Sequence, residues 1–273
     1  LAEHHGRRDL RGFVMPNRKT RESMAGSGVI PADQVRRPEI AGYTLDGLDF
    51  TDADFDVIRF YDSELRNCVF DGIRFRDLKL WRTRVHDCSF REAKLVDAVL
   101  GALEDGVPNS YTGVDLTAAD LRRAVFEYAD FVDVDFSDTN LIDIDFGSAT
   151  FSRCTFSGRL DQLVFWELPP DSERSVRNQM DDVDFSRAEL HGVEFRGLRL
   201  DRVTLPMDDN HVVVHHYDRV LKRAIDELTG SSPYAAGFEH ELRWAHPLRE
   251  VGIWHRDDLD ETVADLLERI DRG

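Results

Sequence analysis

The sequence contains few cysteines, no long apolar run and none of the short motifs that mark the commonest catalytic sites. Purely aliphatic stretches such as Val212–Val214 are far too short to span a membrane. The first ten residues, LAEHHGRRDL, contain no apolar segment of the kind found in secretion signals. No GxGxxG, P-loop, HExxH or GxSxG motif occurs. We therefore expect a cytoplasmic protein that is not an enzyme, spans no membrane and needs no cofactor.

What the sequence does contain is a large apolar residue at every fifth position. In the stretch TDADFDVIRFYDSELRNCVFDGIRF, residues 51–75, Phe or Leu recurs at intervals of five. An amphipathic helix repeats near 3.6 residues and a half-buried strand repeats at 2, so neither explains this spacing. The same register can be followed over four segments, twenty-eight units in all: 45–100, 116–156, 160–165 and 185–205.

A smaller, mostly apolar residue lies two positions before each large one, as at Ala53, Ile58 and Ala129. Residues two apart on an extended segment point the same way, so both can enter a core while the residue between them faces outward. If each unit is followed by a right-angled corner, four units close a square and the fifth stacks on the first, about 4.8 Å away. Residues twenty apart then pile up in columns. The predicted core residues include Phe55, Phe75, Leu95, Phe131, Phe136 and Phe146.

Units such as TDADF (51–55), TAADL (117–121) and EYADF (127–131) match the pattern A(D/N)LXX. Over residues 43–207 the chain thus resembles the pentapeptide-repeat family. The resemblance implies an all-β fold, a right-handed quadrilateral β-helix with four units per coil and about seven coils.

Two interruptions and two ends complete the expected organisation. Residues 101–113 and 166–182 break the register and are rich in turn-forming residues, so we expect loops there, either as tolerated insertions or as binding appendages. Residues 1–42 form an N-terminal capping or partly ordered segment, 43–207 the β-helix, and 208–273 a helical C-terminal region. The candidate loop residues for binding are Glu104, Asp105, Asp171, Glu173 and Arg174.

From residue 208 the period of five gives way to helical patterning. We expect one helix from about 213 to 228, with Asn210 capping its start and Gly230 ending it. A shorter helix is expected around Phe238, and another from 258 to 270, opened by the capping-box-like DLDE. Their apolar faces could cover the last coil, form a homodimer contact, or do both.

Histidines and cysteines offer weaker signals. His211 and His215 are four apart and would share a helix face, which invites a zinc site, but no cysteine pair or fixed ligand spacing accompanies them. We therefore predict no metal site. Cys68, Cys88 and Cys154 occupy the small inward position of a repeat, and although Cys68 and Cys88 would stack in adjacent coils, we interpret all three as buried thiols.

Charge is the clearest functional signal. The net charge is −18, and the stretch AVFEYADFVDVDFSDTNLIDIDFGSATFS, residues 124–152, contains no basic residue. Its seven acids should face outward and encircle about one coil, and we predict that they bind a partner. We call them the acidic girdle: Glu127, Asp130, Asp133, Asp135, Asp138, Asp143 and Asp145. The earlier coils carry both signs of charge.

Two functions fit these features. A rod of about duplex width that carries carboxylates can occupy the basic groove of a DNA-binding protein. In this the chain is similar to quinolone-resistance and self-resistance members of the family, which bind bacterial type II topoisomerases such as DNA gyrase in place of DNA. The resemblance implies inhibition, or resistance to topoisomerase poisons. The alternative is a protein-interaction scaffold with an unrelated partner, and in neither case does the chain itself bind nucleic acid.

Overall fold

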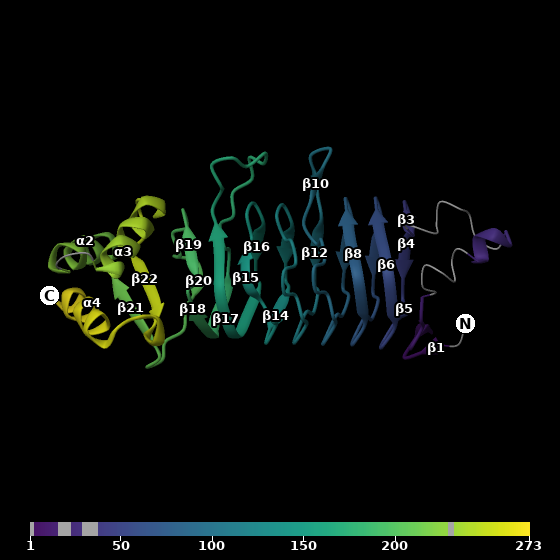
Figure 1. Ribbon diagram of the computed structural model, residues 1–273, viewed down its shortest axis with the longest axis horizontal. Helices are drawn as coiled ribbons and strands as arrows, with labels where there is room; N and C mark the ends of the chain where they lie inside the picture. Colours follow the sequence, from purple (N-terminus) through teal and green to yellow (C-terminus); the bar gives the residue numbers. More distant parts are fainter. Residues whose placement is uncertain (1–2, 16–22, 29–37, 229–231) are drawn as a thin grey trace.

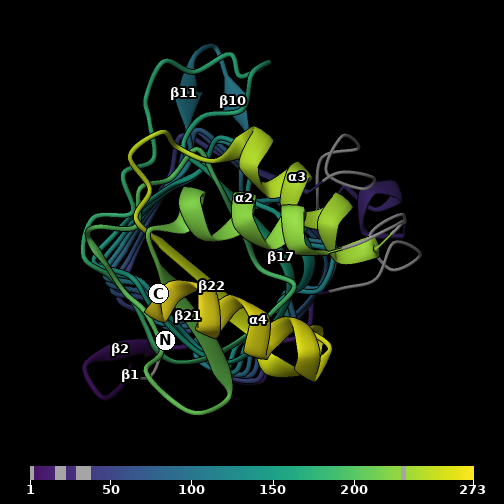
Figure 2. The same cartoon turned by 90° about the vertical axis from the view of Figure 1, so that its left-hand side faces the viewer.

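The computed structural model describes residues 3–15, 23–28, 38–228 and 232–273. Short parallel strands stack along a rod, with the N-terminal strands at one end and three helices at the other (Figure 1). Seen along its axis, the backbone winds as a coil whose end is covered by those helices (Figure 2). The predicted class, a quadrilateral β-helix with an α-helical C-terminal region, is therefore confirmed.

Four ladders of strands form the sides of the rod, and each step along a ladder is usually twenty residues, as in the pairing of Leu45 with Leu65 and of Leu65 with Val85. The first side is a six-stranded parallel ladder of β4 (Thr44–Asp46), β7 (Glu64–Arg66), β9 (Arg84–His86), β12 (Ser110–Thr112), β13 (Asp130–Val132) and β16 (Thr150–Ser152). The second side contains β5 (Leu48–Asp49), β14 (Asp135–Ser137), β20 (Val203–Thr204) and the first residues of β17 (Thr155–Trp166) and β18 (Val183–His191). The third and fourth sides are built from β3 (Glu39–Ala41), β6 (Asp54–Tyr61), β8 (Arg74–Trp81), β15 (Ile142–Asp145), β19 (Glu194–Arg196) and the rest of β17 and β18.

Most corners place one residue in the left-handed region, and this explains much of the composition. Non-glycine corner residues are mostly Asp or Asn, the types that tolerate this conformation best. Those with φ between 49° and 61° include Asp62, Asn67, Asp87, Asp97, Asp133, Asp138 and Asp143. The sequence therefore places polar, often acidic residues on the rod for a local backbone reason.

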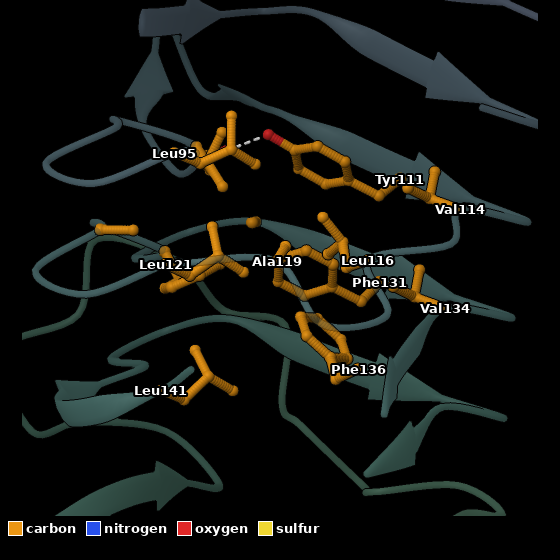
Figure 3. Packing of buried hydrophobic residues seen from close by; sticks show 14 of the residues in the cluster. Leu95, Tyr111, Val114, Leu116, Ala119, Leu121, Phe131, Val134, Phe136 and Leu141 are labelled. Carbon is orange, nitrogen blue, oxygen red and sulfur yellow. Dashed lines mark hydrogen bonds between the residues drawn. The ribbon is translucent and has the colours of Figure 1, made fainter. Parts of the chain in front are cut away.

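The large apolar residues form the predicted columns. The rings of Phe55 and Phe75 lie 5.4 Å apart, and Arg74 bridges to Lys94, the neighbour of Leu95, in the next coil. Phe136 and Phe156 stack in parallel at 4.7 Å. Figure 3 shows the middle of the core, where aromatic and aliphatic side chains from successive coils meet. All six predicted core residues are buried.

The first interruption is shorter than predicted. Only the small hairpin of β10 (Leu103–Glu104) and β11 (Val107–Pro108) leaves the coil, while residues 110–112 form β12 within the first side. Tyr111 fills the column position and donates a hydrogen bond from its hydroxyl to the Leu100 carbonyl, at 2.6 Å (Figure 3). The prediction of a loop over 101–113 was therefore wrong at its C-terminal end, because a tyrosine replaces the usual Phe or Leu.

The N-terminal strands β1 (Glu3–His4) and β2 (Arg7–Asp9) form an antiparallel pair, and β2 adds in parallel to β5. Backbone hydrogen bonds from Leu10 and Met15 to the first coil continue this ladder. The described N-terminal residues thus cover part of the open end of the first coil.

The C-terminal region, which we call the cap, is a small α/β unit. It consists of β21 (His211–His215), α2 (Tyr217–Glu227), α3 (Pro233–Trp244), β22 (Val251–His255), the 3-10 turn η2 (Arg256–Asp258) and α4 (Glu261–Arg272). The β21–β22 pair is antiparallel, and the apolar faces of α2 and α4 pack on it in a core of their own. In the described residues, no helix has both the length and the apolarity to cross a membrane.

Three predictions for the cap were wrong. Residues 211–215 form a strand instead of the start of a helix, because the HVVVH run is rich in β-branched residues and finds a partner forty residues later. His216 and not Asn210 is the N-cap of α2, which ends at Glu227, and Gly230 lies outside the described residues. The helix predicted at 258–270 spans Glu261–Arg272, and no capping-box side-chain bond forms at its start.

Candidate protein-binding surface

The acidic girdle encircles the rod as expected, and none of its residues is buried. Its members lie on three sides and at all four corners: Asp130 on the first side, Asp135 on the second, Asp145 on the fourth, and Glu127, Asp133, Asp138 and Asp143 at corners.

Local backbone structure accounts for several of these carboxylates. Asp133, Asp138 and Asp143 are left-handed corner residues. Asp135 and Asp145 each accept the backbone N–H of the residue two positions later, both at 2.8 Å, and so stabilise the turn. The girdle therefore needs no partner to explain its sequence.

Two girdle carboxylates are partly neutralised by arginines from elsewhere in the chain. Arg153 lies one coil above Asp133 and contacts both of its oxygens, at 2.7 and 2.9 Å. This hydrogen-bonded ion pair lowers the pKa of Asp133. Arg174 reaches Asp130 from the second interruption, at 2.9 Å. Arginines from outside residues 124–152 thus reduce the negative charge that this stretch would otherwise carry.

A longer acidic surface runs along the second side, and the sequence reading missed it. Asp115, Asp135 and Asp184 are outward residues of one ladder, linked through the pairings of Asp115 with Asp135 and of β14 and β18 with β17. Asp115 and Asp184 also accept the N–H two residues later, at 2.9 and 2.8 Å. The signal was present as the recurring triplets DLT at 115, DFS at 135 and DFS at 184.

The corners on either edge of this side add further carboxylates. We define the acidic face as the second side with its two edges, which together present ten acids that are not buried: Asp52, Asp71, Asp87, Glu92, Asp115, Asp133, Asp135, Asp138, Asp182 and Asp184. Three arginines lie on the same surface: Arg91, Arg153 and Arg187. Arg91 pairs with Asp115 at 2.8 Å. Burial opposes ionisation of Asp115, but hydrogen bonds from Thr117 and the Arg91 ion pair outweigh it and lower its pKa.

The charge density of the acidic face can be compared with that of DNA. The face extends over six coil steps, or about 29 Å at 4.8 Å per step. Its net excess is seven carboxylates, which gives one negative charge per about 4 Å, against one per about 1.7 Å for duplex DNA. The face therefore reproduces the sign and the length of a short duplex at less than half its charge density.

The third side differs, because it alternates charges that pair with one another. Arg122 contacts Asp120 at 2.8 Å, and Arg159 contacts Asp161 at 2.9 Å. Lys94 lies on the same ladder. Charge on the rod is thus segregated by side and not only by coil.

Both interruptions leave the rod at the same corner, between the fourth and first sides, and project in the same direction (Figure 1). Tyr111 and Met180, which follow them, are three steps apart on the first side, or about 14 Å. A buried asparagine lies where each interruption rejoins the coil. Asn109 forms hydrogen bonds with backbone groups of Thr83, Leu80 and Leu100, and Asn178 forms them with backbone groups of Phe151, Met180 and Trp166.

The predicted loop residues are not equally free to bind a partner. Glu104 contacts the Tyr61 hydroxyl, and Asp105 pairs with Arg82. The Arg174 side chain is only 8% exposed and also donates to the Ser148 carbonyl, so it anchors its segment to the coil. In the second interruption it is Asp171 and Glu173 that are exposed.

The histidines of the cap do not form the helical pair that the sequence suggested. His211 is buried, whereas His215 is exposed at the other end of β21. In the described part of the chain, no group of three His, Cys, Asp or Glu side chains is placed to hold a metal ion. Cys68, Cys88 and Cys154 are free and buried, as predicted.

The comparisons with known proteins agree with this fold. A sequence model of the family described as pentapeptide repeats matches residues 112–146 and 129–158, with eight copies, and no curated protein matches the sequence. Residues 112–158 therefore match the pentapeptide-repeat family.

Solved structures that resemble the chain are also pentapeptide-repeat or resistance proteins. HetL, a pentapeptide repeat protein involved in heterocyst differentiation regulation from the cyanobacterium Nostoc sp. strain PCC 7120, is 16% identical; 73% of this chain and 90% of that chain are covered, with a TM-score of 0.24. A trypsin-treated variant of QnrB1, a plasmid-mediated fluoroquinolone resistance protein, is 19% identical, with 74% and 91% covered and a TM-score of 0.26. Full-length QnrB1 is 18% identical, with 61% and 81% covered and a TM-score of 0.22.

Proposed function

We propose that this protein is a non-enzymatic DNA mimic that presents its acidic face to the DNA-binding groove of a bacterial type II topoisomerase. Occupation of that groove would inhibit the enzyme or protect it from topoisomerase poisons. The observation that carries the proposal is the acidic face itself, a straight surface of ten carboxylates along one side of the rod. The choice of a topoisomerase follows from the resemblance of the repeats to the quinolone-resistance members of the family.

The charge density of the acidic face limits how strongly it can bind a basic groove. A basic groove gains affinity for DNA mainly from its phosphates, and this gain falls steeply with salt. With less than half the charge density of DNA, the acidic face supports fewer such contacts. We therefore expect binding that weakens with salt, but with a shallower slope than the DNA it replaces. Shape complementarity and the two projecting segments would supply the remaining affinity.

The second candidate function is a scaffold for a protein partner that does not bind DNA. Two observations favour it: several carboxylates have local roles in turns, and the third side carries paired charges of both signs. Salt dependence separates the two functions, because a scaffold contact need not weaken with salt.

A homodimer through the C-terminal helices remains part of the proposal, in a modified form. The apolar faces of α2 and α4 are buried within the cap, so a dimer would use their outer polar faces. The mass in solution, measured by light scattering after size exclusion, tests this directly: a monomer at micromolar concentration would exclude it.

The decisive experiment is a DNA gyrase supercoiling assay with added protein, in the presence and absence of a fluoroquinolone. The test variant combines Asp115→Asn, Asp135→Asn and Asp184→Asn. Asparagine keeps the oxygen that accepts the turn N–H, so folding should be preserved while three charges are lost from the acidic face.

A matched control removes three carboxylates that lie outside both the acidic face and the acidic girdle: Asp54→Asn, Asp62→Asn and Asp97→Asn. We expect the face variant to lose at least tenfold in inhibition or protection and the control to lose little. Equal losses would mean that net charge matters and not the face. If the unmodified protein neither inhibits gyrase nor protects it at micromolar concentration, the topoisomerase proposal fails.

A further inference from the structure

Three buried histidines meet where the cap joins the last coil. His191 lies at the end of β18 on the rod, while His211 and His255 lie opposite each other on β21 and β22 of the cap. Their side chains are at most 8% exposed. The ring centroids of His191 and His255 are 3.7 Å apart, and those of His211 and His255 are 5.1 Å apart.

The hydrogen bonds require each of these rings to be neutral. One nitrogen of each ring faces a group that can only donate: Nε2 of His211 accepts from the Leu190 N–H at 3.1 Å, and Nδ1 of His255 accepts from the Asp257 N–H at 3.2 Å. Nε2 of His191 lies 3.2 Å from the Arg159 guanidinium, which has no acceptor. A proton added to any of the three would meet an N–H group and break that bond.

The same cluster forms part of the contact between the cap and the rod, beside the bonds from Arg249 to the Phe195 carbonyl and from Gly197 to the Trp244 carbonyl. The Leu190 N–H to His211 bond crosses the junction, and so do the bonds from Asp258 to the Gly192 N–H, at 2.8 Å, and to His191 Nδ1, at 3.3 Å. Ile253 of β22 joins the apolar core of the rod at this end. A change in the histidines therefore acts directly on the contact between the two units.

We propose that the junction is a pH-operated latch, in which three uncharged histidines hold the cap on the last coil at neutral pH and acidification releases the cap while the rod stays folded. Carboxylates surround the cluster: Asp208 on His211, Asp258 and Glu189 on His191, and Asp257 beside His255. Their attraction favours protonation, but each ring can accept the proton only by giving up its junction or turn bond. Two protonated rings would also place like charges at the spacing of His191 and His255.

The direction of the pH effect follows from linkage. Burial, together with the neighbouring His191 and His211, lowers the pKa of His255. A histidine that is neutral in the closed state and has its usual pKa in the released state stabilises the closed state above about pH 6.5. This stabilisation is lost as the pH falls. With its lowered pKa, His255 can raise the opening constant up to about tenfold per pH unit as the pH falls below about 6.5.

Hydrogen–deuterium exchange, corrected for the intrinsic pH dependence of amide exchange, tests the latch on the full chain. Between pH 7.5 and 5.5 we expect exchange in 251–255 and 217–227 to accelerate about tenfold, while 130–152 within the rod stays protected. Unchanged exchange in the cap would overturn the proposal. So would simultaneous loss of protection in cap and rod, because the latch must open without unfolding the solenoid.

A variant with His191→Gln, His211→Gln and His255→Asn keeps an oxygen acceptor near each nitrogen but cannot titrate. Its cap should stay closed at both pH values. If this variant does not fold, His255→Asn alone should reduce the pH slope by about one proton. His215→Gln, an exposed change on β21 whose partner Asp271 also lies in the cap, should retain the full acid response. An acid step of undiminished size in the triple variant, or in His255→Asn, contradicts the latch.

Discussion

Phe131→Ala offers the sharpest test of the stacked core. Phe131 is 1% exposed and lies in the middle of the first side. Its ring stacks between Tyr111 at 5.0 Å and Phe151 at 5.2 Å and also contacts Phe126 and Phe136, at 6.0 and 5.4 Å. Truncation would leave a cavity bordered by four aromatic rings.

The expected loss can be estimated from these contacts. A buried Phe→Ala substitution costs about 3–5 kcal/mol, and a favourable aromatic pair contributes about 0.5–1.5 kcal/mol beyond the area it buries. Since Phe131 takes part in two stacked pairs, we expect a loss near the upper limit, about 5 kcal/mol. Phe13→Ala is the control: Phe13 is 41% exposed and has one ring contact, to Phe55, so about 1 kcal/mol should be lost.

Equilibrium unfolding in urea, followed by circular dichroism, measures both losses. Each coil of a solenoid contacts only its neighbours, so a defect in the middle should also separate the transitions of the two halves. A loss below about 2 kcal/mol for Phe131→Ala, with a single transition of unchanged slope, would refute the account of a continuous column.

Three further predictions concern the second interruption and the thiols. Asn178→Leu removes three buried hydrogen bonds and should lower the free energy of unfolding by about 2–3 kcal/mol, measured by urea denaturation; a neutral effect would contradict the closing role of this residue. Arg174→Ala should detach residues 166–182 and raise their cleavage in limited proteolysis about 30-fold, equivalent to about 2 kcal/mol, whereas Arg177→Ala, whose partner Glu167 is at the surface, should change it little. The three cysteines should resist a thiol reagent at pH 8 until the protein is unfolded, since burial raises the pKa of Cys154 to about 11; rapid labelling of the native protein would contradict this.

Much of the rod could be predicted because its five-residue period can be recognised directly in the sequence. A spacing of five residues fits neither a helix nor a flat strand. It predicted that Phe55, Phe75 and Leu95 lie in one column, as the structure shows. The prediction was wrong where the residue type changed but the coil kept its geometry, as at Tyr111. The prediction of a helix at the start of the cap was also wrong, because the strand His211–His215 pairs with Val251–His255, about forty residues away.

The sequence by itself determined the solenoid, because corners that require Asp, Asn or Gly and columns that require Phe or Leu are both local demands of a single repeating unit. Only the tertiary structure decided where charge accumulates. Stacking places residues twenty or twenty-six apart beside each other, so it gathered the acidic face from seven coil levels, set Arg153 against Asp133, and brought three histidines from three strands into one buried junction. These groupings depend on distances across the fold, which no local pattern of residues records.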